Sequence, residues 1–173
     1  LMKMDSKAII FGIKSYKLTS KEKILLKKAK PWGIILFSRN IKNIPQLKNL
    51  ITEIKVTLNV KKYPILIDQE GGKVSRINNI VDLSIFSQNF FGKLYKKNKK
   101  LFLIQYKIYI NTICSIFNYV GININTLPVL DVRRKKAHSI IGTRSFSENS
   151  FTISKLGRLC INFHENNKIA TVI

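Results

Sequence analysis

The sequence predicts an α/β fold in which helices cover a parallel β-sheet. Short runs of isoleucine, leucine and valine alternate along the 173 residues with longer segments whose apolar residues recur at helical spacing. The short runs are apolar throughout rather than at every second position, which is typical of strands buried on both faces of a parallel sheet. Strands and helices that alternate in this way form repeated βα units.

A short helix separates the first two predicted strands. Residues 8–13 form the first apolar run. Thr19 and Glu22 have the spacing of a capping box, in which each side chain satisfies the other residue's backbone N–H, so we expect a helix to begin here. Pro31 cannot continue that helix because it lacks a backbone N–H, and residues 33–37 form the second strand.

A longer helix connects the second strand to the third. Pro45 suits its first turn, where a missing N–H costs nothing. The apolar face that follows has a period of about 3.6 residues. It is made by Leu47, Leu50, Ile51, Ile54 and Leu58. Residues 64–68 form the third strand, which is apolar until its last residue.

The second half of the chain continues the alternation. The longest predicted helix covers about residues 99–119, and Gly121 suits its end because glycine adopts the left-handed backbone of a helix C-terminus. Strands are expected at residues 122–127 and 168–173, with a helix around 153–163 between them.

Two architectures fit this order of elements. One is a doubly wound sheet, and the other is the first part of a (β/α)₈ barrel, which when complete has about 250 residues and eight strands. Only about five strands can be placed here, and the sequence stops inside the apolar run 171–173. Residues 1–173 contain no linker or shift in composition, so we expect a single domain.

The strong positive charge does not by itself identify a partner. The chain has 31 Lys and Arg against 9 Asp and Glu, a formal charge of +22, as is common in proteins that bind nucleic acid or anionic membranes. The excess is mostly lysine, is scattered along the chain, and accompanies many residues whose codons are rich in A and T. Genome composition explains the charge at least as well, so we expect no nucleic-acid and no membrane partner. A basic module for RNA or a membrane surface is therefore the weakest functional interpretation.

Neither a membrane span nor a metal centre is predicted. Polar residues interrupt the most apolar stretch, 101–120, as they do in an ordinary amphipathic helix. The N-terminal apolar run lacks a small-residue cleavage site and is interpreted as a strand, not a signal peptide. Cys114 and Cys160 fit no metal-binding spacing and no disulfide framework, so reduced thiols in a cytosolic protein are expected.

The clearest chemical signal follows the third strand. Asp68 stands at the carboxyl end of that strand, which is where α/β folds bind ligands. Gly71 and Gly72 come soon after it, allowing a sharp turn and a close approach of a ligand to the backbone. A capping aspartate at an ordinary strand-to-loop transition is an equally good interpretation of the same residues.

A second signal lies in the loop before the last helix. Arg144 follows Gly142 there and can offer several donors to a sugar hydroxyl or carbonyl oxygen, although a solvated arginine is the simpler interpretation. The basic run 133–136 is expected to be solvated, and Asp131 to anchor the loop. Neither of the two histidines, at positions 138 and 164, has a partner at the spacing of a catalytic triad, so no residue is assigned to catalysis.

Several segments, in the same order along nearly the whole chain, form a family pattern. They are GIILFSRN at 33–40, QL at 46–47 with Leu50, DQEGG at 68–72, GIN at 121–123, PVLD at 128–131 and IGTRSF at 141–146. Together these segments resemble glycoside hydrolase family 3, in its bacterial β-N-acetylhexosaminidase branch. The DQEGG and IGTRSF segments are specific as a pair, whereas either alone is weak.

The resemblance implies a fold and an activity. The fold would be a partial (β/α)₈ barrel of about the first five strands, the N-terminal part of the catalytic domain. The activity would be release of terminal β-linked N-acetylglucosamine by a retaining mechanism, without cofactor or metal, in cytoplasmic recycling of peptidoglycan. Three substrate-binding residues carry over, with Asp68 accepting hydrogen bonds from sugar hydroxyls and Arg76 and Arg144 donating to sugar oxygens.

The same resemblance also shows which parts of the family's site are absent. Its Lys-His segment, its acid/base histidine and its nucleophilic aspartate would follow Ile173. We therefore expect the 173-residue chain alone to be inactive, with a complementing C-terminal chain as a candidate partner beside the N-acetylglucosamine-containing muropeptide or glycoside. The alternative from another class is a non-catalytic carbohydrate-binding or interaction protein that retains half a barrel.

Overall fold

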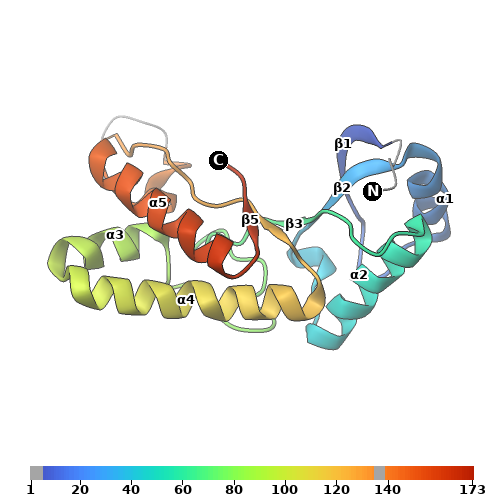
Figure 1. The fold of residues 1–173 in the computed structure, drawn as a ribbon, viewed down its shortest axis with the longest axis horizontal. Helices are drawn as coiled ribbons and strands as arrows, with labels where there is room; N and C mark the ends of the chain where they lie inside the picture. The colour runs from blue at the N-terminus through green and yellow to red at the C-terminus, as the bar shows by residue number, and fades with distance from the viewer. Residues whose placement is uncertain (1–5, 135–138) are drawn as a thin grey trace.

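The computed structural model describes residues 6–134 and 139–173 of the chain (Figure 1). The described residues form one parallel sheet. Its strands are β1 (Lys7–Gly12), β2 (Pro31–Leu36), β3 (Ile65–Ile67), β4 (Ile124–Asn125) and β5 (Ala170–Thr171). The helices are α1 (Ser20–Ala29), α2 (Ile44–Leu58), α3 (Gln88–Lys97), α4 (Lys99–Val120) and α5 (Ser150–Asn166), with short 3₁₀ turns at Ser38–Asn40 and Gly142–Arg144.

The strand order decides between the two predicted architectures. The strands lie side by side in the order β1-β2-β3-β4-β5, so each is added beside its predecessor. A doubly wound sheet reverses its strand order at a switch point, and this sheet does not. The arrangement is an open sheet of four βα units and a fifth strand, as in the first part of a (β/α)₈ barrel, and the prediction of a partial barrel is confirmed.

Local capping explains where most helices begin and end. Thr19 and Glu22 form the predicted capping box, with the Thr19 hydroxyl accepting from the Glu22 N–H at 3.2 Å. Asn43 caps α2, and Pro45 lies in its first turn. Gly121 ends α4 with φ of 98°, the left-handed conformation expected from the sequence.

The core lies between the sheet and the inner faces of α2 and α4. The side chains of β3 are fully buried, and α2 buries the apolar face predicted for it. The middle of α4 contributes large side chains, including Phe102, Tyr106, Ile110 and Phe117. An aromatic group around Phe91 joins α3 to this core, with the ring centroid of Phe91 4.6 Å from that of Tyr106. In Figure 1, α3, α4 and α5 gather at one end of the molecule, and α1 and α2 at the other.

Three features differ from the sequence expectations. The strand β1 is not buried on both faces, because it is an edge strand: Ile9 and Ile10 are 43% and 44% exposed. The helix α3 was not predicted, since its ten residues are rich in lysine and its only apolar cluster is short. The strands β4 and β5 each span two residues, much less than their apolar runs. In the described part of the chain, no helix is long and apolar enough to cross a bilayer.

A substitution at Gly92 can test how tightly α3 packs against the segment that follows β4. A Cβ at this position would overlap the carbonyl oxygen of Phe146. Although alanine favours a helix, we expect Gly92→Ala to lower the free energy of unfolding by about 1–3 kcal/mol, because the backbone must shift to admit the methyl group. Urea denaturation measures the change. Lys96→Ala, at an exposed position of the same helix, should change it by less than about 0.5 kcal/mol, and an equal effect of the two would contradict this packing.

Candidate functional site

A polar cavity lies at the carboxyl edge of the sheet. Its volume is about 700 Å³. Its polar walls are formed by Asp68, Glu70, Arg76, Thr126, Asp131 and Arg144. Asp68 directly follows β3 and Thr126 directly follows β4, and because the two strands are parallel their carboxyl ends meet at one edge. The remaining polar residues reach the cavity from loops that leave the same edge.

Asp68 is held from two sides. The Thr126 hydroxyl donates to Asp68 Oδ1 at 2.7 Å, and Arg76 Nη2 lies 3.5 Å from Asp68 Oδ2. About a quarter of each of the Asp68 and Arg76 side chains remains exposed. The ion pair is long and leaves Asp68 Oδ2 and the terminal nitrogens of Arg76 able to bind a ligand in the cavity, whereas Arg76 Nε is buried and makes no hydrogen bond.

The backbone around Arg76 is held by Gln69, which the sequence analysis left without a role. Gln69 is fully buried, and its Oε1 accepts the Arg76 N–H at 2.7 Å and the Ile77 N–H at 3.3 Å. Its Nε2 donates to the Ser75 hydroxyl at 3.0 Å. One side chain therefore fixes the turn from which the Arg76 guanidinium enters the cavity.

Arg144 is oriented by a buried carboxylate. Glu70 is 5% exposed and accepts two hydrogen bonds from Arg144, from Nε to Oε2 and from Nη2 to Oε1, both at 2.8 Å. This two-pronged geometry is the strong form of an arginine–carboxylate pair. The hydrogen bonds that Arg144 donates to Glu70 raise the pKa of Arg144 above its usual value. Gln88 Nε2 also donates to the Arg144 carbonyl oxygen at 2.6 Å, which ties this turn to α3.

The two glycines of the DQEGG segment make a sharp turn, as predicted, but the close approach is not to a ligand. Gly71 and Gly72 have φ of 80° and 60°, conformations that other residues rarely adopt. A Cβ at Gly71 would overlap the Phe86 carbonyl oxygen, and one at Gly72 would lie 2.7 Å from Ser87 Cβ. The segment leading into α3 occupies the space that a side chain at either glycine would need.

The structure brings the three sequence-predicted residues to one place. Asp68, Arg76 and Arg144 line the same cavity, although they are up to 76 positions apart in the sequence. Sequence reasoning missed the contributions of Glu70 and Thr126, and also of Asp131, which was expected only to anchor its loop but lines the cavity. Glu70 could have been found, because it is a second carboxylate two residues after a strand-end carboxylate. Thr126 had no such signal.

The remaining basic and histidine residues have separate outcomes. Arg133 Nε lies 3.3 Å from Glu148 Oε1 in an exposed ion pair, so at least this part of the basic run pairs with a carboxylate. Lys135, Lys136 and His138 lie outside the described residues. His164 is fully buried in α5, away from the cavity wall. Cys114 and Cys160 are free buried thiols, and burial raises the pKa of each to about 12, which keeps them unreactive.

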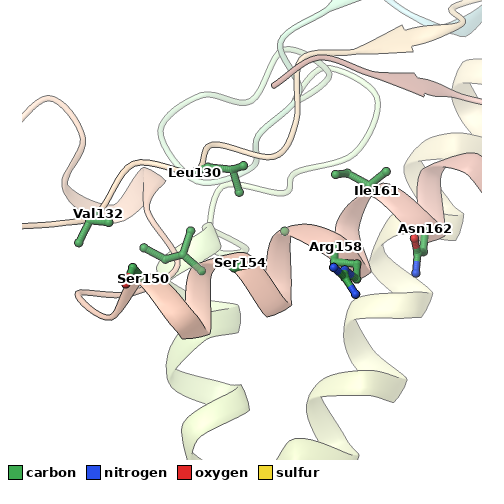
Figure 2. A pocket seen from close by; sticks show the side chains of 9 residues that line it. Leu130, Val132, Ser150, Ser154, Arg158, Ile161 and Asn162 are labelled. Atoms are coloured by element: carbon green, nitrogen blue, oxygen red, sulfur yellow. The ribbon is translucent and has the colours of Figure 1, made fainter.

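A second, smaller cavity of about 370 Å³ lies between α5 and the segment after β4 (Figure 2). Leu130 and Val132, from the segment after β4, lie across from Ser150 and Ser154 on the helix. Arg158 is the one charged side chain among its described lining residues. Its walls are mostly apolar and offer no convergent set of polar groups, so the first cavity is the candidate site.

Comparison with known proteins identifies the family. Residues 3–173 match the family model described as the glycosyl hydrolase family 3 N-terminal domain. The chain belongs to glycosyl hydrolase family 3. The resemblance seen in the DQEGG and IGTRSF segments is thereby confirmed.

The family relatives place the chain in the hexosaminidase branch. It is 32% identical over 150 residues to a β-hexosaminidase of Neisseria meningitidis serogroup A, covering 86% of this chain and 40% of that protein. It is 33% identical over 129 residues to β-hexosaminidase A of Pseudoalteromonas piscicida, covering 72% of this chain and 21% of that protein. A structure of NagZ from Neisseria gonorrhoeae in complex with N-trifluoroacetyl-D-glucosamine matches with a TM-score of 0.85 and 28% identity, over 96% of this chain and 49% of that one. The chain thus spans half or less of the length of these family 3 proteins.

The Glu70–Arg144 pair can be measured with a double-mutant cycle. Because Glu70 is buried, removing either side chain leaves the other without its charged hydrogen-bond partner. We therefore expect the effects of Glu70→Gln and Arg144→Met on the free energy of unfolding to be coupled by about 1–3 kcal/mol. The exposed pair Arg133 and Glu148 provides the matched control, and its cycle should give less than about 1 kcal/mol. Equal coupling in the two cycles would contradict a special role for the buried pair.

Proposed function

We propose that this chain binds the terminal N-acetylglucosamine of a β-linked glycoside in the cavity at the carboxyl edge of the sheet, as part of a retaining β-N-acetylhexosaminidase. The observation that supports the proposal most directly is the convergence of Asp68, Arg76 and Arg144 on one cavity. They come from the loops after β3 and β4, and together they place one carboxylate and two guanidinium groups at the same cavity. The cavity volume lies within the range of small-molecule sites.

Each of the three residues has a distinct task in holding the sugar. Asp68 accepts hydrogen bonds from ring hydroxyls, and Arg76 donates to neighbouring sugar oxygens. Arg144 donates hydrogen bonds from Nε and Nη2 to Glu70, so its other N–H groups are the ones available to the ligand. Because Glu70 fixes the guanidinium in advance, little conformational entropy is lost when the sugar binds.

The relatives support this substrate class. The curated relatives are β-hexosaminidases, and one structural neighbour, a NagZ, is in complex with N-trifluoroacetyl-D-glucosamine. In the family's retaining mechanism a nucleophile attacks the anomeric carbon while an acid/base group protonates the leaving oxygen. The sequence and the cavity assign no residue of this chain to either role. The proposal therefore assigns sugar binding to this chain and the chemical step to residues of a complementing C-terminal segment, in the cytoplasmic recycling of peptidoglycan muropeptides.

A second candidate function is non-catalytic binding of the same sugar. It rests on the same cavity, because Asp68, Arg76 and Arg144 would hold a sugar whether or not a chemical step follows. The two functions differ in whether a completing segment restores hydrolysis, not in the chemistry of the cavity.

Sugar binding can be tested on the 173-residue chain directly. We expect N-acetylglucosamine to perturb the NMR signals of the loop after β3, and Asp68→Asn to weaken binding at least about tenfold, because a carboxylate that accepts two hydroxyl donors is replaced by an amide. Asp82→Asn is the matched control, since Asp82 is exposed, contacts Ser84 and lies outside the cavity. Unchanged binding in Asp68→Asn, or no binding by the unmodified chain, would contradict the proposal.

Hydrolysis is tested with a chromogenic β-N-acetylglucosaminide. We expect no release of the chromophore by the 173-residue chain alone, because no group in its cavity is assigned as nucleophile or acid/base. Turnover by the chain alone that Asp68→Asn abolishes would overturn the division of roles proposed here.

A further inference from the structure

Three fully buried polar side chains form a connected layer behind the cavity. They are Gln69 in the loop after β3, Asn125 at the end of β4, and His164 in α5. None of the three lines the cavity. Buried polar groups are costly unless they are paired, so a connected set in one place requires an explanation.

The hydrogen bonds of this layer allow one arrangement of protons. Asn125 Oδ1 accepts the Gln69 N–H at 3.0 Å, which fixes the orientation of the Asn125 amide. Its Nδ2 then faces the Gln69 carbonyl oxygen at 3.3 Å and His164 Nε2 at 3.1 Å. Because Nδ2 can only donate, His164 must accept at Nε2 and carry its proton on Nδ1. That nitrogen lies 2.8 Å from the Cys160 carbonyl oxygen, a suitable acceptor.

His164 is therefore neutral and of one tautomer. Burial lowers its pKa below the usual value, in agreement with this arrangement. The nearest titratable neighbour is the Cys160 thiol, with Sγ 3.6 Å from Nδ1, and the hydroxyl of Tyr106 lies next to that thiol. The hydrogen bond to the Cys160 carbonyl acts in the opposite direction and raises the pKa, but burial is the larger effect. Among the described residues, no carboxylate lies within hydrogen-bonding distance of the ring.

The layer reaches both sugar-binding residues of the loop after β3. Asn125 binds both backbone groups of Gln69, the residue next to Asp68. The side chain of Gln69 in turn holds the backbone of Arg76. Replacing His164 with a residue that cannot accept a hydrogen bond would leave one Nδ2–H of Asn125 without a partner. The Asn125 amide would then be able to rotate away from Gln69, and the segment that carries both Asp68 and Arg76 would become less rigid.

We propose that His164 is a positioning residue for the sugar site: by accepting a hydrogen bond from Asn125, it keeps Asn125 clamped on Gln69 and so holds Asp68 and Arg76 in place. The proposal rests on the sugar-binding function for its consequence, although the positioning itself exists without ligand. The simpler interpretation is a core histidine that contributes only to stability, and the experiment must separate the two.

The variants are chosen to separate positioning from stability. His164→Leu removes the acceptor. His164→Gln restores it, because a glutamine oxygen reaches about the position of an imidazole Nε2. Leu156→Ala is the matched control, since Leu156 is fully buried in the same helix and its loss destabilises the core without touching the hydrogen-bonded layer.

The first readout needs no sugar. We expect His164→Leu to shift the NMR signals of the Gln69 and Arg76 backbone amides, and His164→Gln and Leu156→Ala to leave them near their original positions. If Leu156→Ala shifts these amides as much as His164→Leu does, His164 has only a structural role and the proposal is wrong. This comparison stands even if the chain proves not to bind sugar, so failure of the proposed function would be seen separately.

The second readout is the affinity for N-acetylglucosamine. His164→Leu should weaken binding about tenfold, and His164→Gln should stay within about twofold of the unmodified chain. Equal affinities of His164→Leu and the unmodified chain would overturn the proposal.

The unmodified chain provides a check that does not depend on any variant folding. The ¹⁵N signals of the His164 ring should show an unprotonated, acceptor Nε2 and a protonated Nδ1 at neutral pH. The opposite tautomer would mean that Asn125 is not held by this ring, and it would overturn the proposal as well.

Discussion

The buried carboxylate of Glu70 is the constraint on which the geometry of the site depends. A carboxylate that is 5% exposed is stable only with a partner, and Arg144 supplies two charge-assisted hydrogen bonds from 74 residues further along the chain. The pair joins the loop after β3 to the turn before α5. It therefore closes one side of the cavity and sets the direction in which the arginine's free N–H groups point.

The parallel sheet explains why these loops can meet at all. Successive parallel strands present their carboxyl ends at one edge, so residues that follow β3 and β4 become neighbours without being close in sequence. The sheet is open, and its two edge strands expose apolar side chains, Ile9 and Ile10 on one side and Val172 and Ile173 beside the other. In a closed barrel, further strands lie between the two edges and hydrogen-bond to both of them, so neither edge is exposed to solvent.

Much of the secondary structure follows from short-range rules. The capping box of Thr19 and Glu22, the helix end at Gly121 and the apolar face of α2 were all predictable, because each depends on residues within a few positions of one another. The helix α3 was missed because its sequence signal is weak and its stability comes from packing. Phe91 inserts among the aromatic rings of α4, and Gly92 lies against the backbone at Phe146. Neither contact has a local pattern.

The sequence by itself determined the type of fold, the family, and the three residues expected to hold the sugar, because motifs and periodicities are properties of neighbouring residues. Only the tertiary structure decided that the sheet runs in consecutive order and that Glu70 orients Arg144. It also decided that His164, which sequence reasoning left without a role, lies in the polar layer behind the cavity. The physical reason is the same in each case: a hydrogen bond between distant residues exists only after packing has brought a donor and an acceptor together and removed the water that would otherwise satisfy both.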